Sequence, residues 1–238
     1  MTGIAEASIA GPGLVVALDG PASSGKSSVG SAVAAALGLR FLDTGLLYRA
    51  LTWLALERGL DPADGPGIAP LVGEIDLGAD AVGRLTRVLV AGRDVAAEIR
   101  TPRVDRAVSA VSRRPEVRAA LLGRQRALAA AGGIVVAGRD IGSVVLPDAD
   151  VKIWLDASAE ERAGRRARER GIDPASPAGR AILDDLHRRD AVDGSREHSP
   201  ARAAADAHHV RTDGNTFEET VAAVLAVVAG AAIPEVEP

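Results

Sequence analysis

Five short, mostly apolar runs recur along the chain, and helical patterns of apolar residues separate several of them. The runs cover residues 14–18, about 40–42, 134–137, 151–155 and about 209–212. Apolar runs of this length are typical of strands buried on both faces of a parallel sheet. Strands that alternate with helices are joined by right-handed crossovers. The pattern therefore predicts an α/β fold of three layers, in which helices cover both faces of a five-stranded parallel sheet.

Two segments depart from this alternation. Residues 61–100 are rich in Gly and Pro, and they hold two strand-like runs, 85–90 and 95–99, around a Gly-Arg-Asp turn. This pattern predicts a hairpin in a small inserted lobe. Residues 101–131 are predicted to be helical, and the arginine-rich residues 157–170 form a second helical excursion. A single domain with two excursions fits the chain better than two domains.

The two ends of the chain give weaker signals. Residues 221–233 are the longest apolar stretch, which is too short to span a bilayer, and Thr216 with Glu219 forms a capping box before it. We therefore expect a last helix that packs on the core. Residues 1–13 have neither the basic nor the apolar region of a signal peptide and are expected to be a flexible tail. We expect a cytoplasmic protein without a membrane partner.

The composition narrows the chemistry. Apolar residues make up 47% of the 238 residues and aromatics only 2%, so aliphatic side chains must fill the core. The absence of cysteine excludes a disulfide framework, a thiolate metal site and a cysteine nucleophile. The net charge of −4 argues against broad binding of nucleic acid. It leaves small anionic ligands open, because arginines can be concentrated locally.

The most specific motif is Gly-Pro-Ala-Ser-Ser-Gly-Lys-Ser at residues 20–27, between the first apolar run and a helical pattern. The backbone N–H groups of such a turn point at one small volume, and the helix N-terminus adds partial positive charge. We expect Lys26 to reach the β- and γ-phosphates of a nucleoside triphosphate and the Ser27 hydroxyl to bind Mg²⁺. The predicted cradle comprises Gly20, Pro21, Ala22, Ser23, Ser24, Gly25, Lys26, Ser27 and Ser28.

Phosphate loops of this kind occur in GTPases, in ATPase motors and in small kinases. The chain has no Asn-Lys-x-Asp string, and no Asp-Glu pair follows a predicted strand, which disfavours the first two classes. The arginines favour a kinase, because transfer between two anions needs planar groups that stay charged. The candidates are Arg49, Arg118, Arg139, Arg162, Arg166, Arg189 and Arg196. Taken singly, each is also explained as a solvated surface arginine, and residues 162–170 as an exposed helix face.

Several further blocks of sequence carry a resemblance. They are residues 20–28, 42–49, 137–145 and 151–158, followed by Arg189, Asp190, Asp193 and Arg196. In this order the blocks resemble bacterial cytidylate (CMP) kinases, over about residues 14–230. The resemblance implies one P-loop kinase domain of the adenylate-kinase type. It also implies an inserted lobe for the nucleoside monophosphate at about 61–118 and a short helical lid at about 157–171.

The resemblance also implies an activity and a set of site residues. The activity is transfer of the γ-phosphoryl group of ATP to CMP or dCMP, with Mg²⁺, in a monomeric enzyme. The family's contacts fall here on Thr44, Arg118, Asp140 and Arg196 for the base, on Arg49 and Arg139 for the acceptor phosphate, and on Ser109, Arg189 and Asp193 for the pentose. The implied catalytic set is Lys26, Arg139, Arg162, Arg166 and Arg189, with Arg165 a further lid candidate. The family often has serine where this chain has Thr44.

The chemistry of cytosine supports the role of Asp140. Cytosine carries an exocyclic amine at N4, which donates to a carboxylate, whereas uracil presents an acceptor there. Two alternatives stay open for Asp140, namely a buried partner of Arg139 and a carboxylate related to Mg²⁺. Asp43 is equally a helix cap or an organiser of Mg²⁺ through water.

Two further side chains are expected to have structural roles only. Tyr48 is expected to pack in the interior, and Arg100 is expected to pair with Asp94 or Glu98. Two other hypotheses for the whole protein stay open. One is a kinase for another small acceptor, such as UMP or shikimate. The other is a nucleotide-binding regulator with a degenerate kinase fold.

Overall fold

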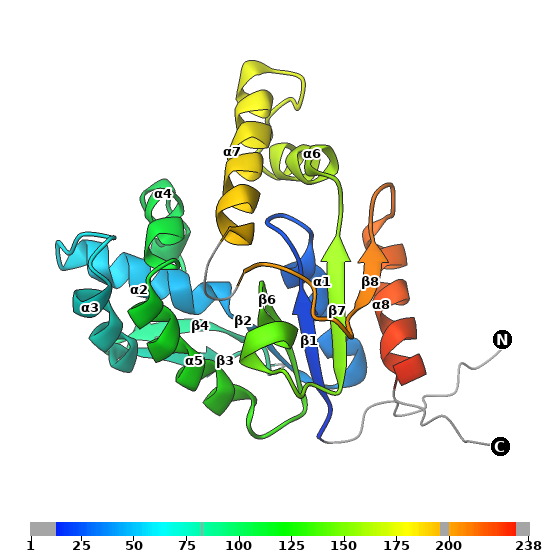
Figure 1. The fold of residues 1–238 in the computed structure, drawn as a ribbon, viewed down its shortest axis with the longest axis horizontal. Coiled ribbons are helices and arrows are strands. Elements are labelled where there is room, and N and C mark those ends of the chain that lie inside the picture. Colours follow the sequence, from blue (N-terminus) through cyan, green and yellow to red (C-terminus); the bar gives the residue numbers. More distant parts are fainter. Residues whose placement is uncertain (1–12, 82, 196–199, 232–238) are drawn as a thin grey trace.

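The computed structural model of the protein describes residues 13–81, 83–195 and 200–231 (Figure 1). Its central sheet has five parallel strands in the order β2-β6-β1-β7-β8. The strands are β1 (Val15–Asp19), β2 (Arg40–Asp43), β6 (Ile134–Gly138), β7 (Val151–Asp156) and β8 (His208–Arg211). Each of the five predicted runs forms one of these strands, so the predicted parallel sheet is confirmed.

Side chains of the strands alternate between two apolar layers. Val16 and Leu18 pack with α1 (Lys26–Leu37) and α8 (Phe217–Ala231) on one face of the sheet. Ala17 packs on the other face, against a cluster that includes the end of α5 (Pro115–Ala129). The three-layer arrangement follows from this alternation, because both faces of each central strand are buried.

The last helix of the described chain is α8, and its capping box is confirmed. The Thr216 N–H donates to Glu219 Oε2 (2.8 Å), and the Glu219 N–H donates to Thr216 Oγ1 (3.1 Å). Residues 232 and 233 of the predicted stretch lie outside the described residues, as do residues 1–12 of the expected tail. Among the described residues, no helix is long and apolar enough to cross a membrane.

The first excursion contains a small antiparallel sheet next to α2 (Gly45–Glu57) (Figure 1). Its elements are α3 (Gly65–Ile68), the 3₁₀ turn η1 (Ala69–Glu74), β3 (Ile75–Ala79), β4 (Leu85–Val90), β5 (Arg93–Asp94) and the 3₁₀ turn η2 (Glu98–Arg100). The predicted strand at 95–99 is wrong, since β5 stops at Asp94 and β4 pairs mainly with β3. Asp94 Oδ1 accepts the Ala96 N–H (3.0 Å), which turns the chain away from the sheet.

The prediction that residues 101–131 are helical is confirmed, with one break. The structure has two helices there, α4 (Pro102–Val111) and α5. Pro115 is the first residue of α5, and Arg114 before it is extended, with φ −71° and ψ 122°. A proline ring disfavours the helical conformation in the preceding residue, so the helix must break and restart at this point.

The second excursion is larger than predicted. The arginine-rich helix is present as α6 (Ala159–Glu169), and a long helix that was not predicted, α7 (Pro177–Gly194), packs against it. Ala163 and Ala167 of α6 meet Ile182 and Leu186 of α7, together with Ala22 of the phosphate loop. Both helices stand beyond the carboxyl ends of β1 and β7 (Figure 1). We call α6 and α7 together the lid.

Candidate active site

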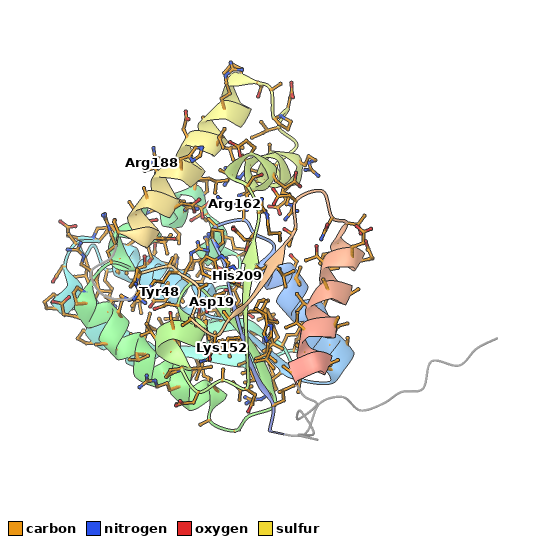
Figure 2. All side chains as sticks on the ribbon, turned by 45° about the vertical axis from the view of Figure 1, so that its right-hand side comes forward. Asp19, Tyr48, Lys152, Arg162, Arg188 and His209 are labelled. Atoms are coloured by element: carbon orange, nitrogen blue, oxygen red, sulfur yellow. The ribbon has the colours of Figure 1, made fainter. Side chains whose placement is uncertain are left out.

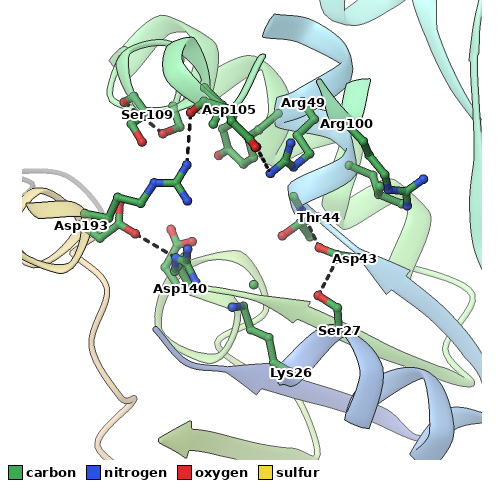
Figure 3. Close-up of a pocket in the computed structure, with 18 of the residues that line it drawn as sticks. Lys26, Ser27, Asp43, Thr44, Arg49, Arg100, Asp105, Ser109, Asp140 and Asp193 are labelled. Carbon is green, nitrogen blue, oxygen red and sulfur yellow. Dashed lines mark hydrogen bonds and ion pairs between the residues drawn. The ribbon is translucent and has the colours of Figure 1, made fainter. Parts of the chain in front are cut away.

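A cavity of about 600 Å³ lies at the carboxyl ends of β2 and β6, next to the phosphate loop (Figure 3). The sheet, the lobe and the lid each supply part of its wall. Its lining includes Lys26, Ser27, Asp43, Thr44, Arg49, Arg100, Asp105, Ser109, Arg118, Arg139, Asp140, Arg166, Arg189 and Asp193. This edge is where open α/β sheets bind their ligands. The structure thus brings most of the predicted site residues to one cavity.

The phosphate loop has the backbone that the motif requires. A Cβ on Gly20 would lie 2.2 Å from the Leu155 carbonyl oxygen, and Gly25 has a φ of +90°. The N-cap residue of α1 is Gly25, which has no side chain to cap the helix, so the first N–H groups of α1 are available to an anion. Lys26 Nζ donates to the Pro21 carbonyl (3.0 Å). Burial, together with the nearby charge of Arg139, lowers the pKa of Lys26 to about 7.

Ser27 and Asp43 form an oxygen-rich pair beside Lys26 (Figure 3). Ser27 Oγ donates to Asp43 Oδ2 (2.7 Å), while Asp43 Oδ1 accepts the Gly45 N–H (2.9 Å) at the start of α2. Both alternatives for Asp43 therefore find support, because one oxygen holds the helix start and the other faces the serine. A hydroxyl and a carboxylate are the hard donors that suit Mg²⁺.

Two arginines on different elements line the cavity between the lobe and the loop. Arg49 Nη2 donates to Asp105 Oδ1 (2.7 Å), and its Nη1 donates to the Ile99 carbonyl (3.1 Å). Arg139 Nε donates to Asp193 Oδ2 (2.9 Å) in α7, and its Nη1 donates to the Gly20 carbonyl (3.0 Å). Arg139 thereby connects β6, the phosphate loop and the lid.

Asp140 pairs with Arg118 and not with Arg139, so one of the alternatives for Asp140 is wrong. The Asp140 and Arg118 side chains are only 8% and 11% exposed. The guanidinium of Arg118 lies 5.8 Å from the ring centre of Tyr48. Tyr48 packs against a hydrophobic cluster, as expected, but it also lines the cavity. Arg118 Nε is buried and has no hydrogen-bond partner among the described residues.

Thr44 and Ser109 also contribute to the wall of the cavity (Figure 3). Thr44 is 4% exposed, and its Oγ1 donates to the Ala137 carbonyl (2.9 Å), which fixes the position of the hydroxyl. A Cβ on Gly138 would lie 2.8 Å from Thr44 Oγ1, so β6 can approach Thr44 this closely only because residue 138 is a glycine. Arg196, the remaining predicted base contact, lies outside the described residues.

The lid arginines do not all face the cavity. Arg166 and Arg189 line it, and Arg189 Nη2 donates to the Asp105 carbonyl (3.2 Å). Arg162 does not line it: it is 5% exposed and lies at the base of the lid (Figure 2). Its guanidinium donates to the carbonyls of Ala157 (2.9 Å) and Ala22 (3.0 Å) and to Asp190 Oδ2 (2.6 Å). Arg165 likewise turns away, to Thr212.

Sequence reasoning missed two cavity residues in the lobe, Arg100 and Asp105. Arg100 was expected to pair with Asp94 or Glu98, but these carboxylates pair with Arg87 and Arg93, and Arg100 Nη1 donates to the Ala96 carbonyl (3.0 Å). The expectation of a purely structural pairing for Arg100 is therefore wrong. No sequence signal identifies Asp105, because its partners come from distant parts of the chain.

A third missed residue, Asp19, holds the segment that directly follows Arg139 and Asp140. It ends β1, is 4% exposed, and accepts the N–H groups of Ile141 and Gly142, both at 2.8 Å. Burial raises the pKa of Asp19 to about 6, against the opposing effect of those hydrogen bonds. The available signal was the one that singled out Asp43 and Asp140, namely a carboxylate next to the end of a buried strand.

A phosphate loop on a parallel sheet, faced by arginines from a lobe and a lid, defines a phosphotransferase of the nucleoside monophosphate kinase class. Residues 16–230 match the family model described as cytidylate kinase, and the chain belongs to this family. Its sequence is 46% identical to the cytidylate kinase of Streptomyces avermitilis over 220 residues, which is 91% of this chain and 93% of the relative. It is 47% identical to the cytidylate kinase of Mycolicibacterium paratuberculosis over 209 residues, covering 87% and 92% of the two chains.

Solved structures with a similar outline are more distant in sequence. A gluconokinase from Sinorhizobium meliloti 1021 has 17% identity and a TM-score of 0.49, and the match covers 93% of this chain and 94% of that one.

Proposed function

We propose that this protein transfers the γ-phosphoryl group of ATP to CMP or dCMP, and that the cavity described above holds both nucleotides. The observation that carries the proposal is the buried Arg118–Asp140 pair in the wall of the cavity that Lys26 also lines. One part of this wall is built for phosphate and another for a polar, uncharged ring. The family's name and the relatives' names support the same reading.

The base assignment rests on complementarity of donors and acceptors. Cytosine offers a donor at N4 next to acceptors at N3 and O2. Asp140 Oδ2 is held by Arg118, which leaves Oδ1 to accept from N4, and the guanidinium of Arg118, which also lines the cavity, can donate to the ring acceptors. Thr44 and Arg196 complete the proposed base contacts, and Ser109, Arg189 and Asp193 the pentose contacts.

The donor side is assigned to residues 20–28. The loop amides and Lys26 would hold the β- and γ-phosphates, and Ser27 would bind Mg²⁺ directly, with Asp43 in reach through water. A bound Mg²⁺ would neutralise charge on the phosphate oxygens. Arg49 and Arg139 would hold the phosphate of the acceptor.

The transfer itself needs little from the protein beyond position and charge. The attacking oxygen belongs to a phosphate that is already ionised, so no side chain has to remove a proton from it. Lys26, Arg139, Arg166 and Arg189 would stabilise the charge of the transferring group. Arg162 would take part only by leaving the Ala22 carbonyl, or by acting through the loop. A monomeric state, a cytoplasmic location and the absence of nucleic-acid binding stay predictions.

A steady-state panel of acceptors tests the proposal. With ATP and Mg²⁺ held constant, kcat/KM should be at least tenfold higher for CMP and dCMP than for UMP, because uracil places an acceptor against Asp140. A tenfold preference for UMP or shikimate would refute the assigned specificity. Failure to form CDP with excess ATP, Mg²⁺ and CMP would favour a nucleotide-binding regulator over an enzyme.

A further inference from the structure

Four carboxylates line the cavity within the described part of the chain: Asp43, Asp105, Asp140 and Asp193. Three of them have proposed roles with metal, base or pentose. Asp105, in the first turn of α4 on the lobe, has none. Its side chain is 22% exposed, so water reaches it.

Asp105 contacts arginines from three separate parts of the chain, and Figure 3 shows it beside Arg49. Its Oδ1 accepts from Arg49 Nη2 of α2 at 2.7 Å, and its Oδ2 lies 3.6 Å from Arg170 Nη2 at the end of α6. Its backbone oxygen accepts from Arg189 Nη2 of α7 at 3.2 Å. One residue of the lobe thus engages an arginine of the core and two of the lid.

The carboxylate occupies arginine donors that the proposed acceptor phosphate would need. Arg49 uses both terminal nitrogens, one on Asp105 and one on the Ile99 carbonyl. Carboxylate and phosphate oxygens bind guanidinium in the same planar geometry. A guanidinium has five N–H groups, so Arg49 keeps others, but a phosphate that binds its terminal nitrogens in this planar geometry would compete with Asp105 for Nη2.

We propose that Asp105 is an internal substitute for the acceptor phosphate, a positioning residue that holds Arg49 in the empty site and is displaced when the monophosphate binds. The inference rests on the proposed role of Arg49 in binding that phosphate. Asp105 keeps Arg49 and the two lid arginines in place and prevents their repulsion while no substrate is present. The competition lowers the affinity for the monophosphate. The competition with the acceptor phosphate depends on the negative charge of Asp105 and not on the shape of its side chain.

A purely structural role makes the opposite prediction. If Asp105 only buttresses Arg49 in its binding conformation, removal of its charge loosens Arg49 and weakens the binding of every phosphate-bearing ligand. The sign of the change in affinity therefore separates the two roles.

The test measures equilibrium binding of CMP, cytidine and inorganic phosphate to the full chain and to Asp105→Asn by calorimetry, without ATP. Partly exposed ion pairs contribute modestly, so we expect the Kd for CMP to fall about fivefold, the Kd for inorganic phosphate to fall in parallel, and that for cytidine to stay unchanged. The gain should shrink in 0.5 M salt, since screening weakens the competing pair. Asp76→Asn, which removes the partner of Arg124 outside the cavity, is the matched control.

Unchanged or weaker binding of CMP and phosphate by Asp105→Asn would overturn the inference, and Asp105→Ser repeats the measurement if the asparagine variant does not fold. Failure of the proposed function has a different signature. In that case the unaltered protein would bind no CMP, while the phosphate arm would still report whether Asp105 competes with an anion for Arg49.

Discussion

Replacing Asp140 by asparagine tests the reading of cytosine, because asparagine keeps the shape of the side chain and removes its charge. In the structure Asp140 is 8% exposed, and its Oδ2 is held by Arg118. The variant loses a charge-assisted hydrogen bond to N4, worth about 2 kcal/mol, which corresponds to a roughly 30-fold higher Kd for CMP. ATP has no proposed contact with Asp140, so its KM should change by less than about twofold.

The acceptor preference should change more than the affinity for CMP alone. The asparagine amide can donate to the O4 of uracil, which the carboxylate repels. The ratio of kcat/KM for CMP over UMP should therefore fall about 100-fold. Steady-state rates with each acceptor at saturating ATP give the ratio, and calorimetry gives the Kd for CMP.

Loss of folded protein must be separated from loss of recognition. Arg118 loses its charged partner in the variant, which costs about 1–3 kcal/mol of unfolding free energy. Urea unfolding measures this cost, and Glu57→Gln, which breaks the exposed pair with Arg103, serves as the control for charge removal. Equal losses for CMP and ATP, or an unchanged ratio of CMP to UMP, would refute the reasoning and reassign Asp140 to metal binding or to structure.

Three further predictions concern the loop, the lid and the buried carboxylate. Lys26→Ala should lower kcat at least about 100-fold and leave the melting temperature unchanged or raised, because burial disfavours the charged form of Lys26 and, among the described residues, its ammonium donates one hydrogen bond, to the Pro21 carbonyl. An active variant would contradict the cradle role. Arg162→Ala should lower the unfolding free energy by about 3 kcal/mol, because Arg162 is buried against Ala22 and Asp190. Arg166→Ala should lower kcat and change the unfolding free energy by less than about 0.5 kcal/mol. Urea titrations and steady-state rates of both variants test this, and a destabilised Arg166 variant beside a stable Arg162 variant would contradict it. Because the pKa of Asp19 is raised from 3.8 to about 6, the folded state binds its proton more tightly than the unfolded state. The proton on Asp19 therefore stabilises the fold fully below about pH 4, and about 3 kcal/mol of this stabilisation is lost as the pH rises through 6. The unfolding free energy of the protein minus that of Asp19→Asn should fall accordingly between pH 4 and pH 7. A difference that does not change with pH would show that the pKa of Asp19 is not raised.

The middle of the central sheet could be predicted from the sequence because β1 and β6 are buried on both faces, whereas the edge strand β8 is exposed at three of its four residues. Residues 134–137 and 151–155 are apolar at nearly every position, so no long-range information is needed to identify them. The strand β3 was missed because Asp76 and Gly78 interrupt its apolar pattern, and its register shifts at Gly78. The break before Pro115 carried a local signal that the helical periodicity outweighed.

The positions of the site residues could be predicted where they follow a strand or form the phosphate loop. The partners of the lid arginines could not be predicted in the same way. Arg162 and Arg166 lie one helical turn apart, so spacing assigns both to one face of α6. The structure buries Arg162 against the Ala22 carbonyl of the loop and leaves Arg166 at the cavity. Tertiary packing determines which of the two arginines donates to the distant Ala22 carbonyl, and no local sequence signal indicates it.

The contact between Arg162 and the Ala22 carbonyl sets the direction of a main-chain donor. A trans peptide is planar, and its C=O and N–H point to opposite sides. The guanidinium that holds the Ala22 oxygen therefore turns the N–H of Ser23 away from Arg162, and Lys26, which holds the Pro21 oxygen, turns the N–H of Ala22 away from its own ammonium. The two cations aim the amides of the loop before any nucleotide arrives, so Arg162 can serve anion binding without touching the anion.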